Sequence, residues 1–336
     1  MKYLPVDRWN PEKDIILEAA DILRSGGLAA FPTETVYGLG ANGFDDKAVG
    51  KIFEAKGRPA DNPLILHISN PAEADGFARV DQRARALMDR FFPGALTLVL
   101  PAKPVVPRGV TAGLGTVAFR MPFHPVPLAL IESLGRPVAA PSANRSGRPS
   151  PTDARAVMQD MGTEKNIGII LDGGICDIGI ESTVIDVSGK NASILRPGGV
   201  PGELIEEFLG VKFTDPGAEM IKGSPGTRYK HYAPLIPLLL WENGGKTEQN
   251  FSCGGSYGYI GLNQPDFHCE GPCVEKIIFN SVENYARGVY ASFRSMEKIG
   301  VSCIIAEVPS VYGIGRALKD RLLRAAGTPV SYGDHA

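Results

Sequence analysis

Two cations separated by one residue, Lys56 and Arg58, are the first side chains whose types and spacing suggest chemistry. Gly57 between them permits a turn or a close approach to a ligand, whereas Pro59 and Pro63 disfavour helix in the residues before them. We therefore expect Lys56 and Arg58 to lie on non-helical backbone. An ammonium is a compact point charge and a guanidinium is a planar fork, so the pair suits several oxygens of a polyphosphate. The alternative is a solvated loop with two incidental charges.

Further cations occur where predicted strands end; they are Arg120, Arg148 and Arg196. Ligands gather outside strand ends in α/β sheets, so the repeated context predicts that these arginines share one cationic cavity with Lys56 and Arg58. Neutral side chains in the same contexts would supply hydrogen bonds to a base, a ribose or a phosphate. They are Ser142, Asn144 and Ser150, and their alternative role is turn formation.

Three more polar side chains lie in or near the predicted strands. Thr33 and Thr35 follow a short apolar run and could meet a polar substrate, although threonines in this position are also ordinary strand residues. His67 lies between apolar residues. A half-buried histidine with one satisfied hydrogen bond explains that pattern at least as well as a ligand contact.

Length and composition indicate a soluble globular protein with two domains. The chain has 336 residues, of which 43% are apolar and 21% charged, and its net charge is -2. A single core of this size would be unusual, and so small a net charge gives no global field that would recruit nucleic acid. Charges near the N-terminus interrupt the apolar run that a signal peptide needs, and Leu235 to Trp241 is too short to span a bilayer. We expect a cytoplasmic protein without membrane association.

The cysteines do not indicate a disulfide framework. Five is an odd number in a large chain, which argues against a secreted scaffold. Cys269 and Cys273, with His268 and Cys253 nearby, could be called a zinc site, but their spacing is not that of a standard knuckle. We expect no protein-bound metal there, and the role of these cysteines stays open.

Hydrophobic periodicity predicts a strand-rich α/β domain over residues 1–210. Asn10, Pro11 and Glu12 should open a helix that Gly26 and Gly27 stop. Further helices are expected over 48–55, 82–90 and 203–209. Strands are expected over 28–31, 64–68, 96–100, 116–119, 138–140, 167–171, 183–187 and 193–195.

The composition changes over residues 211–237, which we expect to form a linker that doubles as a lid. A plain spacer would lack its aromatic and basic groups. An α/β pattern returns over 238–336, with strands expected over 237–240, 256–261 and 301–308 and a last helix over 315–326. Another helix from Asn280 or Ser281 should bury the face that carries Tyr285, Val289, Phe293 and Met296. Gly313 and Gly315 before the last helix are a weak anion-binding fingerprint.

Several of these segments together resemble the YrdC-like family. They are the run from Phe31 to Leu39, Lys56-Gly57-Arg58, Ser142-Ala143-Asn144 and the linker run from Ser224 to Pro234. Each is unspecific alone, but their order and contexts are specific in combination. With the second α/β domain, nearly the whole chain resembles the long form of this family, the threonylcarbamoyl-AMP synthases. The resemblance implies an N-terminal twisted mixed-sheet domain with a cationic cavity, a linker and a smaller Rossmann-like domain.

The activity implied by the resemblance is the conversion of ATP, L-threonine and bicarbonate to threonylcarbamoyl-AMP and pyrophosphate. This nucleotidyl transfer is the first step toward threonylcarbamoyladenosine in tRNA. A downstream tRNA-modifying transferase would receive the adenylate, and direct tRNA binding stays open. Mg²⁺ would be held by the phosphates and water, because the sequence shows no carboxylate cage.

The resemblance also assigns site residues. The catalytic residues that grip the phosphates would be Lys56, Arg58, Ser142 and Asn144. The ATP site would be completed by Asn62, Thr116, Ser150 and Arg196. Threonine would be held by Thr35, His67, Arg120 and Ser182, with Arg120 the natural partner of its carboxylate. Linker contacts would come from His231 and Tyr232.

Two other functions stay open at this point. A cationic cavity on this fold could hold structured RNA without catalysis, although interleaved aromatic platforms and a basic charge balance are lacking. The chain could also be a carbamoyl-adenylate enzyme that uses carbamoyl phosphate, as in related hydrogenase-maturation proteins. Those proteins would be expected to carry acylphosphatase and zinc-finger segments, and the sequence shows neither.

Overall fold

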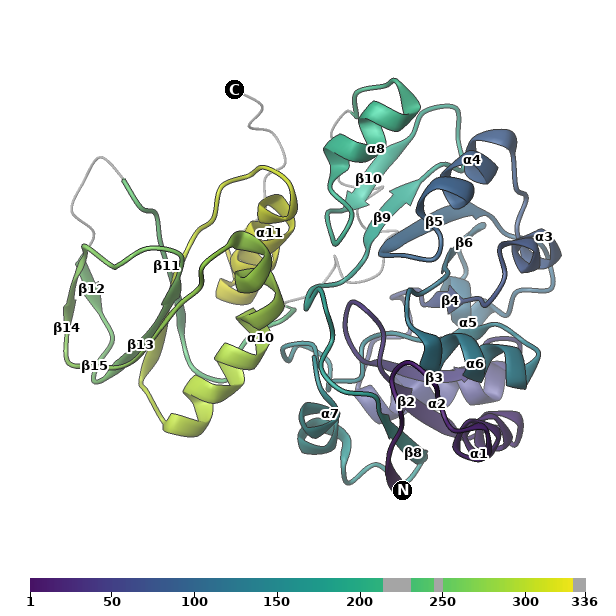
Figure 1. Ribbon diagram of the computed structural model, residues 1–336, viewed down its shortest axis with the longest axis horizontal. Coiled ribbons are helices and arrows are strands. Elements are labelled where there is room, and N and C mark those ends of the chain that lie inside the picture. The colour runs from purple at the N-terminus through teal and green to yellow at the C-terminus, as the bar shows by residue number, and fades with distance from the viewer. Residues whose placement is uncertain (214–230, 245–249, 329–336) are drawn as a thin grey trace.

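The computed structural model describes residues 1–213, 231–244 and 250–328, and its strands form two main sheets (Figure 1). The larger sheet contains β1 (Lys2–Pro5), β2 (Leu28–Phe31), β3 (Gly38–Asn42), β4 (Ile65–His67), β5 (Leu96–Pro101), β6 (Thr116–Arg120), β7 (Val138–Ala139), β8 (Ile167–Asp172), β9 (Thr183–Asp186) and β10 (Ser193–Arg196). Their order is β1-β8-β2-β3-β7-β4-β6-β5-β9-β10. The sheet contains both parallel pairs, such as β4 with β6, and antiparallel pairs, such as β5 with β6, so the predicted mixed sheet is confirmed.

Helices cover both faces of the larger sheet. They are α1 (Lys13–Arg24), α2 (Asp46–Lys56), α3 (Ala74–Phe77), α4 (Gln82–Phe91), α5 (Arg108–Thr111), α6 (Pro125–Leu134), α7 (Ala154–Met161) and α8 (Gly202–Leu209), with a short 3₁₀ turn at Pro71–Glu73. Strand β2 shows why its four residues are all apolar. Ala29 and Phe31 pack with α1 and α6, whereas Leu28 and Ala30 join the core that includes α2. Because successive side chains alternate between faces, a strand covered on both sides must be apolar throughout.

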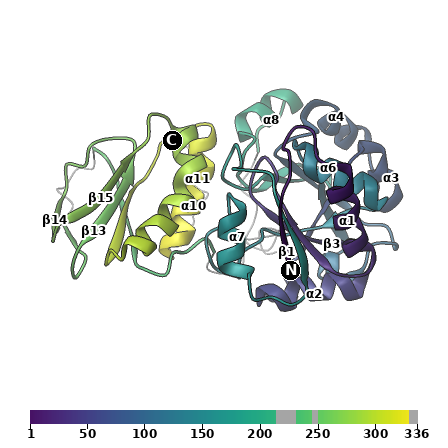
Figure 2. The same ribbon diagram turned by 60° about the horizontal axis from the view of Figure 1, so that its bottom comes forward.

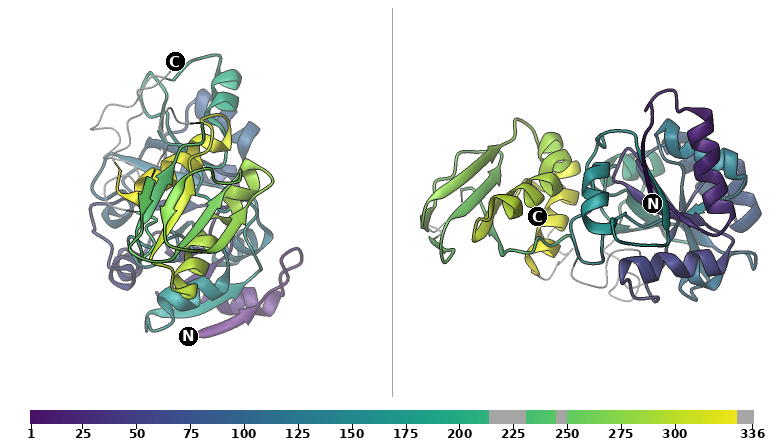
Figure 3. Two further views of the ribbon diagram at one scale, coloured as in Figure 1. Left: turned by 90° about the vertical axis from the view of Figure 1, so that its left-hand side faces the viewer. Right: turned by 90° about the horizontal axis from the view of Figure 1, so that it is seen from below.

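The smaller sheet contains β11 (Leu238–Trp241), β13 (Tyr257–Gly261), β15 (Cys273–Ile278) and β16 (Cys303–Glu307), in the order β11-β16-β13-β15 with each neighbouring pair parallel. A two-stranded ladder pairs β12 (Asn250–Ser252) with β14 (His268–Glu270). Helices α10 (Val282–Ile299) and α11 (Ile314–Ala326) lie between the smaller sheet and the larger body (Figures 1 and 2). The views in Figure 3 show the same arrangement. The predicted second α/β unit is therefore confirmed.

The predicted buried face of α10 is confirmed. Tyr285, Val289, Phe293 and Met296 are all buried. The side chain of Ser281 caps the helix by accepting a hydrogen bond from the Asn284 N–H at 3.1 Å. Spacing and cap signal therefore agree on this element.

Helix α1 differs from the prediction at its start. It begins at Lys13, and Asn10 does not cap it. The Asp7 carboxylate accepts hydrogen bonds from the N–H groups of Trp9 and Asn10, so a turn takes up these residues. Local side-chain to backbone bonds of this kind compete with helix.

Two elements of the larger body lacked a strong sequence signal. Strand β3 contains Gly38 and Gly40, and a Cβ at Gly40 would lie 2.6 Å from the Phe31 ring. Helix α6 contains two prolines in its first turn, and His124 caps it. The strand needs glycine because it packs closely against an aromatic ring, and the helix can begin with proline. Glycine and proline are also typical of loops, so the sequences of β3 and α6 both look like loops.

A disulfide joins Cys253, the residue after β12 of the two-stranded ladder, to Cys303, the first residue of β16 in the smaller sheet. The sequence analysis, which argued against a disulfide framework, did not predict this bond. Within the described ranges, no group of three or more His, Cys, Asp or Glu side chains could hold a metal ion. Among the helices of those ranges, none is long and apolar enough to cross a membrane.

The division into residues 1–210, 211–237 and 238–336 stays a prediction. The larger sheet ends at Arg196 and the smaller one begins at Leu238. Most of the predicted linker and lid, residues 214–230, lies outside the described residues.

Candidate active site

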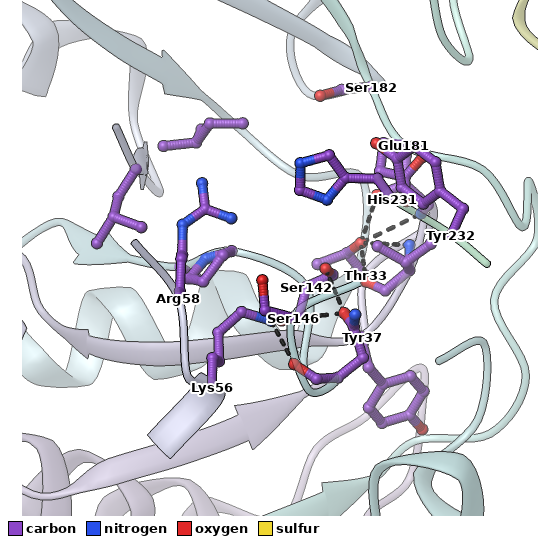
Figure 4. A pocket seen from close by; sticks show the side chains of 18 of the residues that line it. Thr33, Tyr37, Lys56, Arg58, Ser142, Ser146, Glu181, Ser182, His231 and Tyr232 are labelled. Atoms are coloured by element: carbon purple, nitrogen blue, oxygen red, sulfur yellow. Dashed lines mark hydrogen bonds between the residues drawn. The ribbon is translucent and has the colours of Figure 1, made fainter. Parts of the chain in front are cut away.

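A pocket lies where strand ends of the larger sheet meet residues 231 and 232 (Figure 4). Among the described residues, the cations that line it are Lys56, Arg58, Arg120, Arg148 and Arg196. The five cations that the sequence analysis grouped by context therefore lie around one pocket. Figure 4 shows Lys56 and Arg58 on one side of it and His231, Tyr232 and Glu181 on the other.

Lys56 is the last residue of α2, which corrects the expectation that it lies on non-helical backbone. Gly57 then takes a left-handed conformation with φ of 61° and ends the helix, as a glycine at this position commonly does. The Lys56 ammonium donates hydrogen bonds to the backbone oxygens of Ser142, at 2.5 Å, and Asn144. Burial, together with the nearby Arg58 charge, holds the pKa of Lys56 well below its ordinary value. A bound phosphate would supply a negative charge beside this ammonium and so favour its protonated form.

Arg58 follows the glycine on irregular backbone, as predicted. Its guanidinium donates to the backbone oxygen of Pro63 at 3.1 Å and lies 3.3 Å from that of Asn62. Burial lowers the pKa of Arg58 to about 10, so the group stays charged near neutral pH. Neutral carbonyl contacts orient this cation without cancelling its charge.

Ser142 and Asn144 shape the turn that faces Lys56. The Ser142 hydroxyl donates to Asn144 Oδ1 at 2.5 Å, and Asn144 Nδ2 donates to the backbone oxygens of Arg145 and Arg148 at 2.7 and 2.9 Å. These bonds fix the carbonyl groups that hold the Lys56 ammonium. Asn144 therefore both holds the turn that faces Lys56 and lines the pocket.

Arg120 ends β6 and is buried. Its Nη1 donates to the Thr35 hydroxyl at 2.9 Å, and its Nη2 forms an ion pair with Glu34. Its Nε has no hydrogen-bond partner among the described residues. A buried N–H without a partner is costly, and a carboxylate ligand would satisfy it.

His67 lies opposite Arg120 in the parallel pair of β4 and β6. Its Nδ1 is 3.2 Å from the backbone oxygen of Ile65. Burial and the Arg120 charge lower the pKa of His67 to about 3, so its imidazole is neutral at physiological pH. A neutral His67 can exchange hydrogen bonds with a ligand but adds no cation to the pocket.

Arg196 ends β10 and contacts Ser182. Its Nη2 donates to the Ser182 backbone oxygen at 2.9 Å and lies 3.2 Å from the hydroxyl. That hydroxyl is also 2.8 Å from the Thr97 hydroxyl. Ser182 and Arg196 thus form one polar wall whose geometry is fixed by the sheet.

His231 and Tyr232 close part of the pocket and are both buried. The next residue, Ala233, donates its N–H to the Gly147 backbone oxygen at 2.9 Å, which holds this segment against the larger body. Burial, with the Arg58 charge next in importance, lowers the pKa of His231 to about 3. The segment therefore covers the cations with neutral side chains.

Three residues assigned by resemblance do not line the pocket; they are Asn62, Thr116 and Ser150. Asn62 offers its backbone oxygen to Arg58, and the Ser150 hydroxyl donates to Glu181 at 2.6 Å. Thr116 begins β6, at the opposite end from Arg120. Their roles in binding ATP stay predictions.

The sequence analysis missed Glu181, which lines the pocket within its described part. The resemblance assigned the neighbouring Ser182 to the threonine site, but no sequence pattern marked Glu181 as a residue of the pocket. Glu181 accepts hydrogen bonds from Ser150, from Tyr290 and from Arg321. Tyr290 and Arg321 lie on α10 and α11, far away in the sequence. Only the packed structure brings these groups together.

The lining residues fit a magnesium ion that arrives with a nucleotide. Glu181 is the one Asp or Glu among the described lining residues, and other protein groups already engage it. Mg²⁺ is commonly held by substrate phosphates and water rather than by a protein cage.

Two family models together match most of the chain. One, described as "Telomere recombination" and covering Sua5, YciO and YrdC proteins, matches residues 21–198. The other, described as "Threonylcarbamoyl-AMP synthase, C-terminal domain", matches residues 200–327. Every residue discussed around the pocket falls within one of these two ranges.

Curated relatives and solved structures agree with the family models. The chain is 44% identical to threonylcarbamoyl-AMP synthase of Pyrococcus abyssi, over 92% of this chain and 93% of the relative. It is also 44% identical to the protein of that name from Bacillus subtilis, over 93% of each. The crystal structure of P. abyssi Sua5 complexed with L-threonine superposes with a TM-score of 0.86 at 40% identity, covering 97% of this chain and 98% of the other. Escherichia coli YciO matches with a TM-score of 0.53 at 27% identity, covering 59% of this chain and 96% of the other.

Proposed function

The chain belongs to the Sua5 family of threonylcarbamoyl-AMP synthases, and we propose that it converts ATP, L-threonine and bicarbonate to threonylcarbamoyl-AMP and pyrophosphate. The observation that carries the proposal is the pocket itself. Among the described residues, five cations and several neutral hydrogen-bonding side chains line one pocket. Such a site suits a reaction in which charge moves among phosphate oxygens.

Threonine would lie at the Arg120 side of the pocket. The Nε–H of Arg120, which has no partner among the described residues, suits the substrate carboxylate, and Thr35, at 2.9 Å from Nη1, orients the guanidinium. Ser182 and neutral His67 would supply hydrogen bonds to the rest of the substrate. The P. abyssi structure is of Sua5 complexed with L-threonine, which supports threonine as a ligand of this chain.

ATP would lie against the wall formed by Lys56, Arg58, Ser142 and Asn144. Their charges and donors would face the phosphates, and Arg196 would add a further cation. Asn62, Thr116 and Ser150 would act indirectly, because they do not line the pocket. His231 and Tyr232 would cover the bound substrates and exclude water.

The proposed chemistry begins at the threonine amine. The amine takes up bicarbonate with loss of water and gives a carbamate. A carbamate oxygen then forms a bond to the α-phosphorus of ATP, and the bond from that phosphorus to the β-bridging oxygen breaks, which releases pyrophosphate. The residues of this chain would position the two reacting groups and stabilise the phosphate charge. Phosphate-bound Mg²⁺ would supply further charge neutralisation.

We propose that the adenylate passes to a tRNA-modifying transferase. A carbamoyl-adenylate is a mixed anhydride and reacts readily with water, so it must reach its acceptor quickly. The covered pocket supports this role because it can keep the product from water until release.

Product identification tests the proposed function. Purified protein is incubated with ATP, Mg²⁺, threonine and ¹³C-bicarbonate, and the mixture is analysed by mass spectrometry. We expect threonylcarbamoyl-AMP that carries one ¹³C atom. Formation of threonyl-AMP without the label, or of no adenylate at all, would contradict the proposal.

A further inference from the structure

The carboxylate of Glu181 lies where the C-terminal helices meet the pocket. Glu181 comes from the larger body, just before β9, and it lines the pocket. Its Oε1 accepts a hydrogen bond from the Ser150 hydroxyl at 2.6 Å, and its Oε2 accepts one from the Tyr290 hydroxyl at 3.2 Å. The proposed reaction assigns no role to this acid.

Arg321 of α11 holds the same carboxylate from the other side. Its Nε donates to Glu181 Oε2 at 2.6 Å, and its Nη2 donates to the Pro197 backbone oxygen at 2.9 Å. Only 1% of the Arg321 surface is exposed, so solvent hardly screens this pair. Pro197 directly follows Arg196. Arg321 therefore hydrogen-bonds both to Glu181 and to the segment that carries Arg196.

Arg321 also contacts the segment that covers the pocket. Its guanidinium carbon lies 5.2 Å from the centre of the Tyr232 ring, within the range of cation–π contacts. The Tyr232 ring also stacks on the Tyr290 ring, with the two ring centres 5.7 Å apart. Thus Arg321 and Tyr290 together touch Glu181 and Tyr232, two groups that line the pocket from different parts of the chain.

We propose that Arg321 is a positioning residue of the active site, supplied by the C-terminal domain. Resting on the proposed function, the inference is that Arg321 neutralises Glu181 and holds it toward the interface, so that this carboxylate competes less with the phosphates of ATP for the pocket cations. Without Arg321, the nearest strong cation for Glu181 would be Arg196. The acid would then compete with the substrate for the positive charge on which the reaction depends.

The surroundings of Glu181 agree with this role. The charged and titratable groups that face it are Arg321, Tyr290, Arg196, His231 and Tyr232. Burial raises the pKa of Glu181, but the charges of Arg321 and Arg196 outweigh burial and lower it below the ordinary value. Glu181 is therefore an anion at neutral pH, and Arg321, which also pairs with Asp320 through Nη1, is the cation that the C-terminal helices place against it.

The test compares steady-state kinetics of the full chain and three variants. Arg321→Gln removes the charge, and we expect kcat/KM for ATP to fall about a hundredfold, as small misplacements at a reacting centre can cause. Glu181→Gln in the same chain removes the competing charge but keeps an oxygen that can accept from Ser150. We expect this double variant to recover at least about tenfold of the loss. Tyr290→Phe, which removes one hydroxyl only, should reduce kcat/KM about threefold to tenfold.

A matched control is Arg316→Gln on the same helix. Arg316 forms a half-exposed ion pair with Glu203 at 3.6 Å, also between α11 and the larger body, but outside the pocket. We expect its kinetics to stay within about twofold of the wild type, because exposed pairs contribute little. A purely structural role for Arg321 would make the double variant no better than Arg321→Gln, and that result would overturn the proposal.

Two further readouts keep the outcome decisive. Loss of the Arg321 charge should raise the pKa of Glu181, because burial then weighs more. Protonation of Glu181 should remove its competition for the pocket cations, so the activity of Arg321→Gln relative to wild type should rise as the pH falls; a constant ratio would contradict the proposal. If Arg321→Gln does not fold, Tyr290→Phe carries the test, and full kcat/KM in Tyr290→Phe would overturn the proposal. Failure of the wild-type protein to form the adenylate would instead refute the proposed function.

Discussion

Replacing Arg120 by lysine should weaken threonine binding selectively. In the structure, one guanidinium carries out two tasks, since Nη2 pairs with Glu34 and Nη1 donates to Thr35 at 2.9 Å. The remaining Nε–H has no partner among the described residues and is available to a ligand. A lysine ammonium has one nitrogen and no planar fork, so it can stay paired with Glu34 but cannot also bind a carboxylate in two places.

The expected magnitude follows from the lost contacts. A hydrogen bond to a charged group contributes about 1.5–3 kcal/mol. Losing one such bond to threonine, about 2 kcal/mol, should raise the KM for threonine about thirtyfold. The KM for ATP should change less than about threefold, because Lys56 and Arg58 are untouched. Arg120→Lys keeps a positive charge beside buried Glu34, so the loss of stability should be limited. Removing the charge altogether would leave Glu34 buried without a cation and would destabilise the fold severely.

The assay is pyrophosphate release with threonine and ATP varied separately. Arg145→Lys is the control, because Arg145 forms an exposed ion pair with Glu164 and does not line the pocket. Both KM values of this control should match the wild type. A normal KM for threonine in Arg120→Lys, or an increase confined to ATP, would refute the assignment of Arg120 to the threonine carboxylate.

Two further predictions concern stability. His67 has a folded pKa of about 3 against 6.5 as its ordinary value, so its neutral form stabilises the fold above pH 6.5 and this stabilisation is lost as the pH falls toward 3. Between pH 7 and pH 5, urea unfolding should show the wild type losing about 2 kcal/mol more than His67→Gln, and equal losses would contradict the buried neutral histidine. Gly179→Ala should lower the free energy of unfolding by about 2 kcal/mol or more, because φ is +79° and the new Cβ would lie 2.4 Å from the Arg287 backbone. Gly50→Ala in α2, where nothing lies within 4 Å, should instead be neutral or stabilising, and similar effects of the two changes would refute the close packing at Gly179.

Local patterns were sufficient to predict most elements and to group the basic residues that line the pocket. The apolar run at β2 and the buried face of α10 follow from periods of 2 and 3.6 residues, and both were predicted correctly. Lys56 shows the limit of such reasoning. The prolines after it suggested irregular backbone, yet α2 continues through Lys56 because the left-handed Gly57, not a proline, ends it.

Long-range pairs could not be predicted from sequence. Glu181 and Arg321 are 140 residues apart, and neither sits in a motif that identifies the other. Strand β3 was missed because its glycines look like a turn, although they are required by the Phe31 ring packed against them. In both cases the deciding factor is a tertiary contact, which composition and periodicity do not encode.

The central claim, that the cationic pocket catalyses adenylate formation from three substrates, is tested most directly by pyrophosphate release. ATP is supplied with threonine and bicarbonate each present or omitted, and wild type is compared with Lys56→Ala, Arg58→Ala and the exposed control Arg145→Ala. We predict release that requires both co-substrates, falls at least about a hundredfold in the two pocket variants, a loss of roughly 2.7 kcal/mol, and is unchanged in the control. Release that proceeds equally without threonine, or that survives in Lys56→Ala and Arg58→Ala, would contradict the account.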